Sequence, residues 1–319
     1  MTLVLSTLVV LVALVEIGAS LLAMYKSAQA VKNFPITGQL IDVTGTKIHV
    51  AVMGAGADLV VIHGSSGNLR DFTTSLAPRL AKAYRVILLD RPGLGHSEGF
   101  DARGETLRDQ ALMLRDVSLQ LGVKKPLVLG HSFGGAVALA WALHAPKDIS
   151  ALILLSAPSH PWDTGLSAYY KIMSAPFFGN YTSRLVCAFA PERAIQKNLK
   201  ETFSPQTIPE DYRDKIGLEL YLQPKVMLAN ARQRRNLKKQ IREMTPHYPK
   251  ISVPTEIVHG TSDHIVPLEI HAKLLAKDLP NSNLTALTGI GHMPHHWSQE
   301  AVCEAIDNAA KRAGLRSDQ

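Results

Sequence analysis

Leu127-Val128-Leu129-Gly130-His131-Ser132-Phe133-Gly134-Gly135 is the stretch that decides the fold of this chain. An apolar run ends in Gly-x-Ser-x-Gly, and the apolar, helix-favouring residues 136–142 follow at once. This order predicts a buried strand that turns sharply into a helix and holds the hydroxyl of Ser132 at the turn. Glycine is needed at 130 and 134 because side chains there would collide where strand and helix pass closely.

Two further blocks follow Ser132 along the chain. Asp263 ends His259-Gly260-Thr261-Ser262-Asp263, and His292 ends Gly289-Ile290-Gly291-His292. A serine hydroxyl is a weak nucleophile at neutral pH and needs a base nearby, and the base needs its other ring nitrogen held. The order predicts a triad of Ser132 as nucleophile, His292 as base and Asp263 as its acid partner. The alternative for Asp263 is that it caps a following helix.

A metal site is the alternative for His292, because His295 and His296 are its neighbours. No Glu or Cys joins them at the spacing of zinc ligands, so we expect no metal, and no organic cofactor is implied. His295 and His296 are expected to be lining or surface residues. His63 and His131 are expected to be buried scaffold residues, and Asp90 is expected to bond the turn that follows it, residues 91–93.

Composition limits the class of protein. The chain has 319 residues, of which 46% are hydrophobic and 19% charged, so it can bury a sizeable core. Its two cysteines, Cys187 and Cys303, are far apart and form neither a disulfide framework nor a CxxC metal pattern. The net charge is +7. No groove-reading motif accompanies this charge, so we expect no nucleic acid partner and favour an anionic membrane surface.

The first segment is almost wholly apolar from residue 3 to residue 24, broken chiefly by Glu16. As a helix it would extend about 33 Å, enough to cross a bilayer core of roughly 30 Å. Residues 1–30 are therefore predicted to be a transmembrane anchor in the lipid bilayer. A cleaved signal peptide is the rival, since Ala28-Gln29-Ala30 resembles a cleavage site, but a basic start is absent and the apolar run is long. Lys26 and Lys32 follow the span, which predicts a cytoplasmic catalytic domain.

The rest of the chain follows a β/α rhythm with one interruption. A hairpin is predicted at 39–43 and 47–52, and buried strands at 59–63, 85–90, 127–131, 151–155, 255–259 and 283–287. Helices are predicted at 71–82, 106–121, 135–144 and 267–277, and from about 298. We predict one α/β core, residues 36–157 and 249–319, interrupted by a mostly helical insertion at residues 158–248.

Five ordered blocks carry a family resemblance. They are His63-Gly64-Ser65-Ser66-Gly67-Asn68, Asp90-Arg91-Pro92-Gly93-Leu94-Gly95-His96-Ser97, Gly130-His131-Ser132-Phe133-Gly134, His259-Gly260-Thr261-Ser262-Asp263-His264-Ile265-Val266-Pro267 and Gly289-Ile290-Gly291-His292. With these blocks the chain resembles the α/β-hydrolase superfamily, and among it the serine-nucleophile members that carry a helical cap. The resemblance implies a mostly parallel central sheet flanked by helices. It also implies an oxyanion hole made by the backbone N–H groups of Phe133 and Ser65.

The nucleophile narrows the reaction. An Asp in its place would suggest an epoxide hydrolase or a haloalkane dehalogenase. Ser132 instead suits an acyl-enzyme route on a small-molecule acyl substrate: an ester, thioester, amide or lactone, or C–C cleavage of a diketone. The sequence thus predicts a membrane-anchored, esterase- or lipase-like serine hydrolase. A slow ligand-binding receptor on the same fold and an acyltransferase stay open as alternatives.

Two features of the insertion have more than one interpretation. Residues 225–242 contain seven Lys or Arg and no acid, which is typical of a solvated helix face but also suits contact with lipid headgroups. The insertion is rich in aromatic residues, which either line a pocket over the triad or form the core of the cap. They are Trp162, Tyr169, Tyr170, Phe177, Phe178, Tyr181, Phe189 and Phe203.

Overall fold

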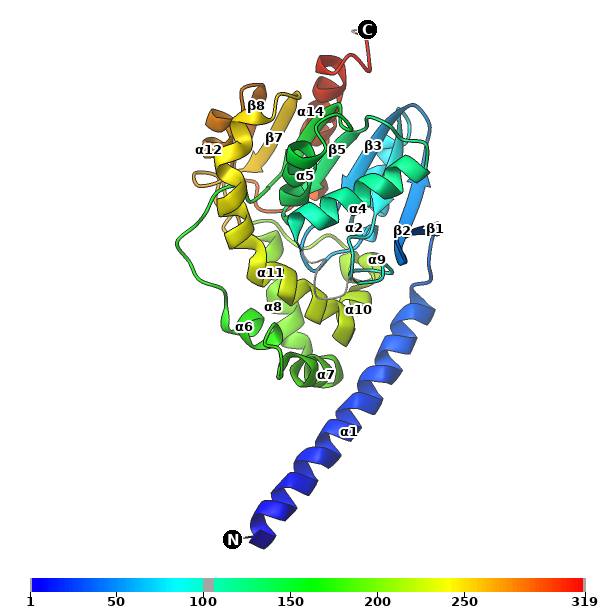
Figure 1. Cartoon of the computed structure of the whole chain (residues 1–319), viewed down its shortest axis with the longest axis vertical. Helices are drawn as coiled ribbons and strands as arrows, with labels where there is room; N and C mark the ends of the chain where they lie inside the picture. The colour runs from blue at the N-terminus through cyan, green and yellow to red at the C-terminus, as the bar shows by residue number, and fades with distance from the viewer. Residues whose placement is uncertain (1, 100–105, 318–319) are drawn as a thin grey trace.

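The computed structural model describes residues 2–99 and 106–317, and within them it forms one eight-stranded sheet (Figure 1). The strands are β1 (Gln39–Val43), β2 (Thr46–Met53), β3 (Ala57–Ile62), β4 (Tyr84–Leu89), β5 (Leu127–His131), β6 (Ala151–Leu155), β7 (Thr255–Gly260) and β8 (Ser282–Leu287). Their order across the sheet is β1-β2-β4-β3-β5-β6-β7-β8. The hairpin β1–β2 pairs antiparallel, β2 pairs antiparallel with β4, and the remaining pairs are parallel. The predicted mostly parallel sheet is confirmed.

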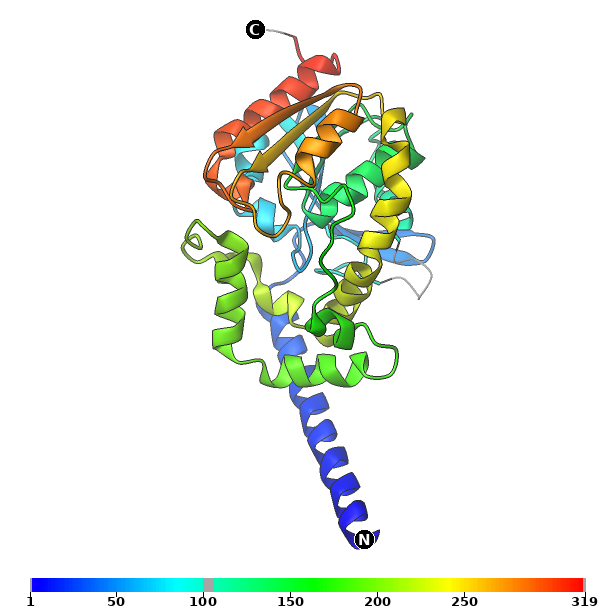
Figure 2. The same cartoon turned by 90° about the vertical axis from the view of Figure 1, so that its left-hand side faces the viewer.

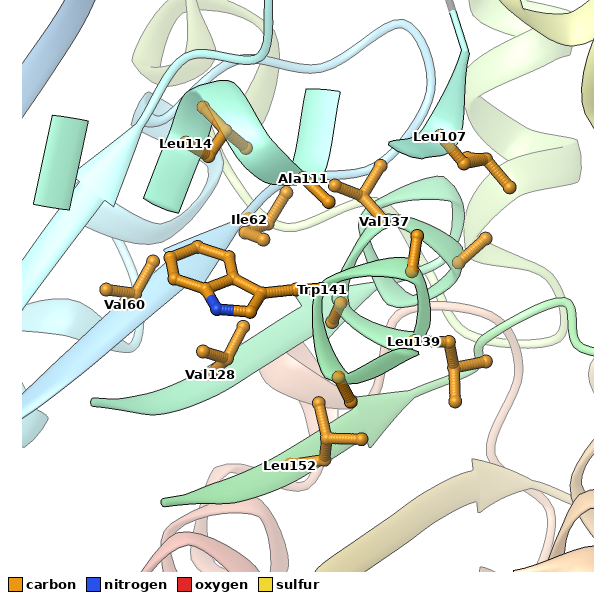
Figure 3. Packing of buried hydrophobic residues seen from close by; sticks show 14 of the residues in the cluster. Val60, Ile62, Leu107, Ala111, Leu114, Val128, Val137, Leu139, Trp141 and Leu152 are labelled. Carbon is orange, nitrogen blue, oxygen red and sulfur yellow. The ribbon is translucent and has the colours of Figure 1, made fainter. Parts of the chain in front are cut away.

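Helices cover both faces of this sheet, which explains why the central strands β5 and β6 are buried along their whole length. One face packs against α4 (Leu107–Gln120), α5 (Phe133–His144) and α12 (Ala272–Asp278). The other packs against α3 (Ala77–Leu80) and α14 (Gln299–Arg312). Neighbouring residues of β5 therefore go to different cores: Val128 to the first, Leu127 and Leu129 to the second. Figure 3 shows the fully buried ring of Trp141 within the first core, beside Val128.

Two predicted helices differ from the structure. The helix expected at 71–82 is two short ones, α2 (Arg70–Thr73) and α3. The break has a local cause: Pro78 has no N–H to donate, and its ring would collide with the carbonyl four residues earlier, so the first helix cannot continue. The helix expected at 267–277 begins only at Ala272, after a turn that starts at Pro267.

The segment between β6 and β7 is helical. Its elements are α6 (Ala168–Met173), α7 (Gly179–Phe189), α8 (Glu192–Phe203), α9 (Tyr212–Ile216), α10 (Leu218–Tyr221), α11 (Pro224–Met244) and the 3₁₀ helix η1 (Thr245–Lys250). We call this segment the cap. It bonds the loop after β3 through Asn68, whose side-chain amide donates to the carbonyl of Ile216 at 2.9 Å. The cap therefore lies against the loop from which the oxyanion hole is expected.

Helix α1 (Thr2–Asn33) is a long arm whose first half projects away from the rest of the molecule (Figures 1 and 2). Its second half packs against α7 and α10 of the cap. Among the described residues it is the one helix that is long and apolar enough to cross a membrane, a property that membrane anchors share with signal sequences.

Candidate active site

Ser132 occupies a strained turn between β5 and α5. Its φ is +50°, a conformation that non-glycine residues adopt rarely and that is typical of a nucleophile elbow. Two backbone hydrogen bonds hold it there. Its N–H donates to the carbonyl of Leu155 at 2.8 Å, and its carbonyl accepts from the N–H of Gly135 at 2.8 Å. The backbone of Ser132 is consequently fixed at the edge of the sheet.

Positions 130 and 134 require glycine because a side chain would not fit there, as the sequence predicted. A Cβ atom at Gly130 would lie 2.3 Å from the carbonyl oxygen of Gly134. A Cβ at Gly134 would lie 2.2 Å from the carbonyl oxygen of Ile62 in β3. Both obstacles are backbone atoms that cannot move without shifting strand or helix. Neither position tolerates a side chain.

The structure brings the three predicted triad side chains together. The hydroxyl of Ser132 lies 2.9 Å from Nε2 of His292, and Nδ1 of His292 lies 2.8 Å from Oδ2 of Asp263. Ser132 and His292 are each 5% exposed and Asp263 is 4% exposed. The chain of contacts thus runs from a hydroxyl through an imidazole to a carboxylate in a site largely closed to water.

The carboxylate of Asp263 is held in its charged form. Burial alone would raise the pKa of Asp263, but the charge of His292 and hydrogen bonds from His259 and His292 outweigh burial and lower it. Its other oxygen accepts the backbone N–H groups of Ile265 and Val266 at 2.9 Å each. Asp263 therefore closes a turn and holds His292 at once. It caps no helix, because the next helix begins only at Ala272.

The loop after β3 lies beside the nucleophile. A Cβ atom at Gly64 would come within 3.2 Å of the Cβ of Ser132. The carbonyl of Gly64 faces away and accepts from the guanidinium of Arg91 at 3.1 Å. Because the C=O and N–H of one peptide unit point in opposite directions, the N–H of Ser65 points away from Arg91. Within the described residues, the N–H groups of Ser65 and Phe133 donate to no other protein atom, which leaves both for a ligand.

Arg91 is a buried cation that holds this loop. It is fully buried and stacks on the ring of Phe133 at 4.2 Å, and it also donates to the carbonyl of His63 at 3.1 Å. Burial, with a smaller effect from the charge of Arg234, lowers the pKa of Arg91 to about 9, so it is charged at neutral pH. Gln110 of α4 accepts from the same guanidinium at 2.9 Å.

Two residues of α11 join the cap to this loop, and the sequence analysis missed both. Oδ1 of Asn230 accepts from the hydroxyl of Ser65 at 2.8 Å and from the N–H of Ser66 at 2.9 Å. Oε1 of Gln233 accepts from Arg91 at 2.7 Å. The charge of residues 225–242 does not reveal this role, but their spacing does. Asn230 and Gln233 lie on one helix face together with residues 226, 237 and 241, and the rest of that face is apolar.

Three further histidines, His131, His295 and His296, form a cluster next to His292. His131 donates from Nε2 to the carbonyl of His292 at 2.9 Å, and its buried Nδ1 has no hydrogen-bond partner among the residues that the structure describes. His295 and His296 both bond Asp71, at 3.1 and 2.9 Å. The ligand atoms of Asp71, His131 and His295 lie within 4.8 Å of one another, so a metal ion would find its donors here. The expectation of lining or surface residues is wrong for His295, which is completely buried.

Asp71 is a further residue that the sequence analysis did not single out. Burial would raise its pKa, but the charge of His295 and hydrogen bonds from His295 and His296 lower it well below its ordinary value. The hydroxyl of Tyr212, in the cap, also donates to Asp71 at 2.9 Å. Asp71 therefore ties α2, the short helix α13 (Pro294–Trp297) that carries His295 and His296, and the cap together.

Asp90 is structural, but not in the predicted way. We expected it to bond the turn that follows it. Its carboxylate instead accepts the N–H of Leu69 at 2.7 Å and the N–H of His96 at 2.9 Å. The N–H of Arg91, at the start of that turn, donates to Nε2 of His63 at 2.9 Å, so the turn has other partners. His63 thereby orients its loop, as expected.

The aromatic residues of the cap divide into two groups, and neither interpretation fits all of them. Phe203 is buried in the cap against Tyr212 and His296, and Trp162 packs on the main core. Tyr170 packs on a small core that includes Met173 and Met227. Five others are exposed: Tyr169, Phe177, Phe178, Tyr181 and Phe189. For these five both expectations are wrong, because exposure depends on which neighbour covers the helix and not on its composition.

Comparison with known proteins gives a consistent picture. The family model described as alpha/beta hydrolase fold matches residues 59–299. A 2-hydroxy-6-oxononadienedioate/2-hydroxy-6-oxononatrienedioate hydrolase of Pseudomonas putida is 27% identical over 270 residues, covering 79% of this chain and 86% of the relative. A 2-hydroxymuconate semialdehyde hydrolase of Pseudomonas sp. strain CF600 is 29% identical over 302 residues, covering 91% and 95%.

Solved structures agree on the fold. A thermophilic esterase from Thermogutta terrifontis superposes with a TM-score of 0.69 at 20% identity, covering 86% of this chain and 99% of the esterase. A meta-cleavage product hydrolase from Pseudomonas fluorescens IP01 superposes with a TM-score of 0.70 at 20% identity, covering 85% and 98%. Given the match of the family model over most of its length, the chain belongs to the α/β-hydrolase fold family and is an enzyme of the hydrolase class.

Proposed function

We propose that this protein is a membrane-anchored serine hydrolase that cleaves a carboxylic ester or a related acyl bond through an acyl-enzyme on Ser132. The observation that carries the proposal is the continuous contact from the hydroxyl of Ser132 to His292 at 2.9 Å and on to Asp263 at 2.8 Å. This is the arrangement that a weak nucleophile needs at neutral pH.

Each step uses a group already described. His292 removes the proton of Ser132 as its oxygen attacks the acyl carbon, and Asp263 stabilises the imidazolium that forms. The N–H groups of Ser65 and Phe133 bind the oxyanion, and loss of one such donor costs about 10²–10³ in rate. His292 then gives the proton to the leaving group. It next activates a water molecule that hydrolyses the acyl-enzyme and frees Ser132.

C–C bond hydrolysis is the second candidate, because the relatives named above include a dienedioate/trienedioate hydrolase and a semialdehyde hydrolase, and one solved structure is a meta-cleavage product hydrolase. A dienedioate carries two carboxylates, and a buried site binds a carboxylate best with a cation. Among the described residues Arg91 is the one buried Lys or Arg, and four of its five N–H donors already bond protein atoms. This shortage of free positive charge favours an uncharged acyl substrate.

The anchor rests on how α1 meets the cap. Ala19, Ala23 and Ala30 are at most 2% exposed because the second half of α1 packs on α7 and α10. Cleavage after Ala30 would remove all of these contacts, so the packing favours a retained anchor over a signal peptide. Lys26 and Lys32 at the end of the span favour a cytoplasmic catalytic domain.

A matched pair of serine variants tests the catalytic proposal. Ser132→Ala should lower kcat on short p-nitrophenyl esters by about 10⁶-fold. Ser156→Ala is the control, because Ser156 is also buried, also has a positive φ of 46° and has no hydrogen-bond partner for its hydroxyl among the described residues. Its activity should stay within a few-fold of wild type.

The substrate preference of the wild-type enzyme distinguishes the two candidate reactions. A kcat/KM that is higher on an uncharged ester than on a dienedioate supports ester cleavage, and the reverse order supports C–C cleavage. Activity of Ser132→Ala equal to that of Ser156→Ala would remove the triad from the mechanism.

A fluorophosphonate probe tests the anchor. It should label the wild type in the membrane fraction, and label confined to the soluble fraction would contradict the anchor.

A further inference from the structure

Helix α7 is amphipathic in the opposite sense to a surface helix of a soluble protein. Its buried positions include Gly179, Ser183 and Cys187, which are small and spaced four residues apart. Its exposed positions are Asn180 and three large apolar or aromatic residues, Tyr181 (53% exposed), Leu185 (37%) and Phe189 (59%), and Phe178 (68%) stands just before the helix. In water the hydrophobic effect would turn this outer stripe inward. The surroundings that suit α7 are therefore apolar.

The exposed patch continues into the residues before α7. Ile172 is 52% exposed and Phe177 is 82% exposed. Residues 168–190 contain no Asp or Glu, and their charged residues are Lys171 and Arg184. A large apolar patch with basic residues at its margin is the composition of a helix that lies in a membrane interface.

Helix α7 lies across α1 at the lower edge of the body, where the free half of α1 begins (Figure 2). Nζ of Lys26 donates to the carbonyls of Ala188 at 2.7 Å and Cys187 at 3.3 Å, at the end of α7. Ala23 is buried beneath the same turn. The two helices are thus fixed to each other, so the depth of α1 in a bilayer sets the depth of α7.

The one acidic residue of the apolar part of α1 is paired within this contact. Oε1 of Glu16 lies 3.0 Å from the guanidinium of Arg184, and their side chains are 20% and 43% exposed. A single carboxylate is costly in hydrocarbon, whereas a paired one is tolerated. The pair therefore allows this level of α1 to enter the apolar layer together with α7.

The length of α1 also indicates that its level of contact with α7 enters the apolar layer. In the part of α1 that precedes Glu16, residues 2–15, every side chain whose burial the structure describes is exposed, and this part extends about 21 Å at 1.5 Å per residue. The hydrocarbon core of a bilayer is roughly 30 Å thick. The missing length of about 9 Å must come from the part of α1 that packs on α7, and it matches the 5–10 Å to which interfacial helices sink.

From these observations we infer that the cap itself enters the membrane: α7 and the end of α6 lie in the lipid interface, with Ile172, Phe177, Phe178, Tyr181, Leu185 and Phe189 among the acyl chains. This inference rests on the proposed anchor and adds a second membrane element to it. It places the cap, and with it the covered active site, directly on the lipid surface. A lipid-borne acyl substrate would then reach the enzyme without crossing bulk water.

Two leucines of equal exposure allow a matched test. Leu185 of α7 and Leu274 of α12 are each 37% exposed, and α12 lies at the opposite side of the body (Figure 1). Full-length Leu185→Trp and Leu274→Trp are reconstituted into phosphatidylcholine–phosphatidylglycerol vesicles whose lipids are brominated in the upper acyl chain. Bromine quenches tryptophan at short range, so quenching reports contact with acyl chains. The wild type, with three tryptophans, supplies the background.

The inference expects the added fluorescence of Leu185→Trp to fall roughly twofold or more at the depth of an interfacial helix, while that of Leu274→Trp is unchanged. Phe189→Trp, on the same stripe, should behave like Leu185→Trp and guards against a local folding defect. Equal quenching of the 185 and 274 variants in protein that floats with the vesicles would overturn the inference and leave the anchor intact. Protein that does not float at all would overturn the anchor and this inference with it.

Discussion

Two apolar helices of this molecule have opposite surroundings. Helix α5 follows the nucleophile, and ten of its residues, Phe133 to Ala142, are buried between the sheet and its neighbours. Helix α1 is also rich in apolar residues, yet Val4, Leu8 and Leu11 are more than half exposed. Composition alone does not distinguish them. The comparison teaches that apolar composition indicates a need for apolar surroundings, while the rest of the fold decides whether other parts of the protein cover the helix or leave it exposed.

The largest effect should come from removing apolar surface on each helix in turn. Trp141→Ala in α5 empties a fully buried site and also loses the bond from Nε1 to the carbonyl of Asp148 at 3.2 Å. We expect the free energy of unfolding to fall by about 3–5 kcal/mol. Val10→Ala in α1, where Val10 is 57% exposed, should stay within about 0.5 kcal/mol in detergent. Denaturant unfolding of both variants measures the difference, and equal losses would erase the contrast.

Adding a methyl group to a glycine of each helix tests the same difference between α5 and α1 by steric means. Gly134→Ala would place a methyl group 2.2 Å from the carbonyl oxygen of Ile62, and overpacking of this kind costs about 1–3 kcal/mol or more. Because Phe133 and Ser132 move with it, kcat should fall as well. Gly18→Ala meets no atom within 4 Å and should leave both stability and kcat essentially unchanged. Thermal unfolding and ester turnover provide the two measurements, and a harmless Gly134→Ala would refute the packing argument.

A third effect concerns pH and compares a buried with an exposed histidine. Burial, followed by the charges of His259 and His160, lowers the pKa of His271 to about 3, and its Nδ1 accepts the N–H of Ser159 at 3.2 Å. Between pH 6.5 and about 3 the unfolded chain binds a proton that the folded chain does not. The free energy of unfolding should therefore fall on acidification through this window, by about 1.4 kcal/mol per pH unit. Above pH 6.5 this contribution is fully present.

His271→Gln should remove that part of the slope, whereas His264→Gln, at an exposed position, should keep it. Denaturant midpoints measured at pH 7, 6 and 5 give the slopes. Identical slopes for the two variants would mean that His271 protonates in the folded protein.

The sequence predicted those parts of the structure that depend on local pattern. The strands and the elbow at Ser132 follow from apolar runs and from glycines that a close approach requires. The sequence also predicted a triad, because each of its blocks follows a predicted strand and parallel strands end at the same edge of a sheet. The convergence of Asp263 and His292 on Ser132 is the step that needed coordinates to measure.

Other features depend on contacts between distant segments and could not be predicted. Asp71 acquires its role only when His295, His296 and Tyr212 arrive from other parts of the chain. The stripe on α7 is a different case. Its spacing was visible in the sequence and identifies one face of a helix, but period alone does not tell whether that face turns toward the core or away from it.

The direction of α5 has a consequence for the chemistry. Its first residue is Phe133, so the helix points its amino end at the oxygen of Ser132. Aligned peptide dipoles give such an end about half a positive elementary charge. The scaffold therefore favours an anion at this point before any side chain contributes. Helix α1 has the same dipole, but its amino end projects away from the body, where no reaction can use it.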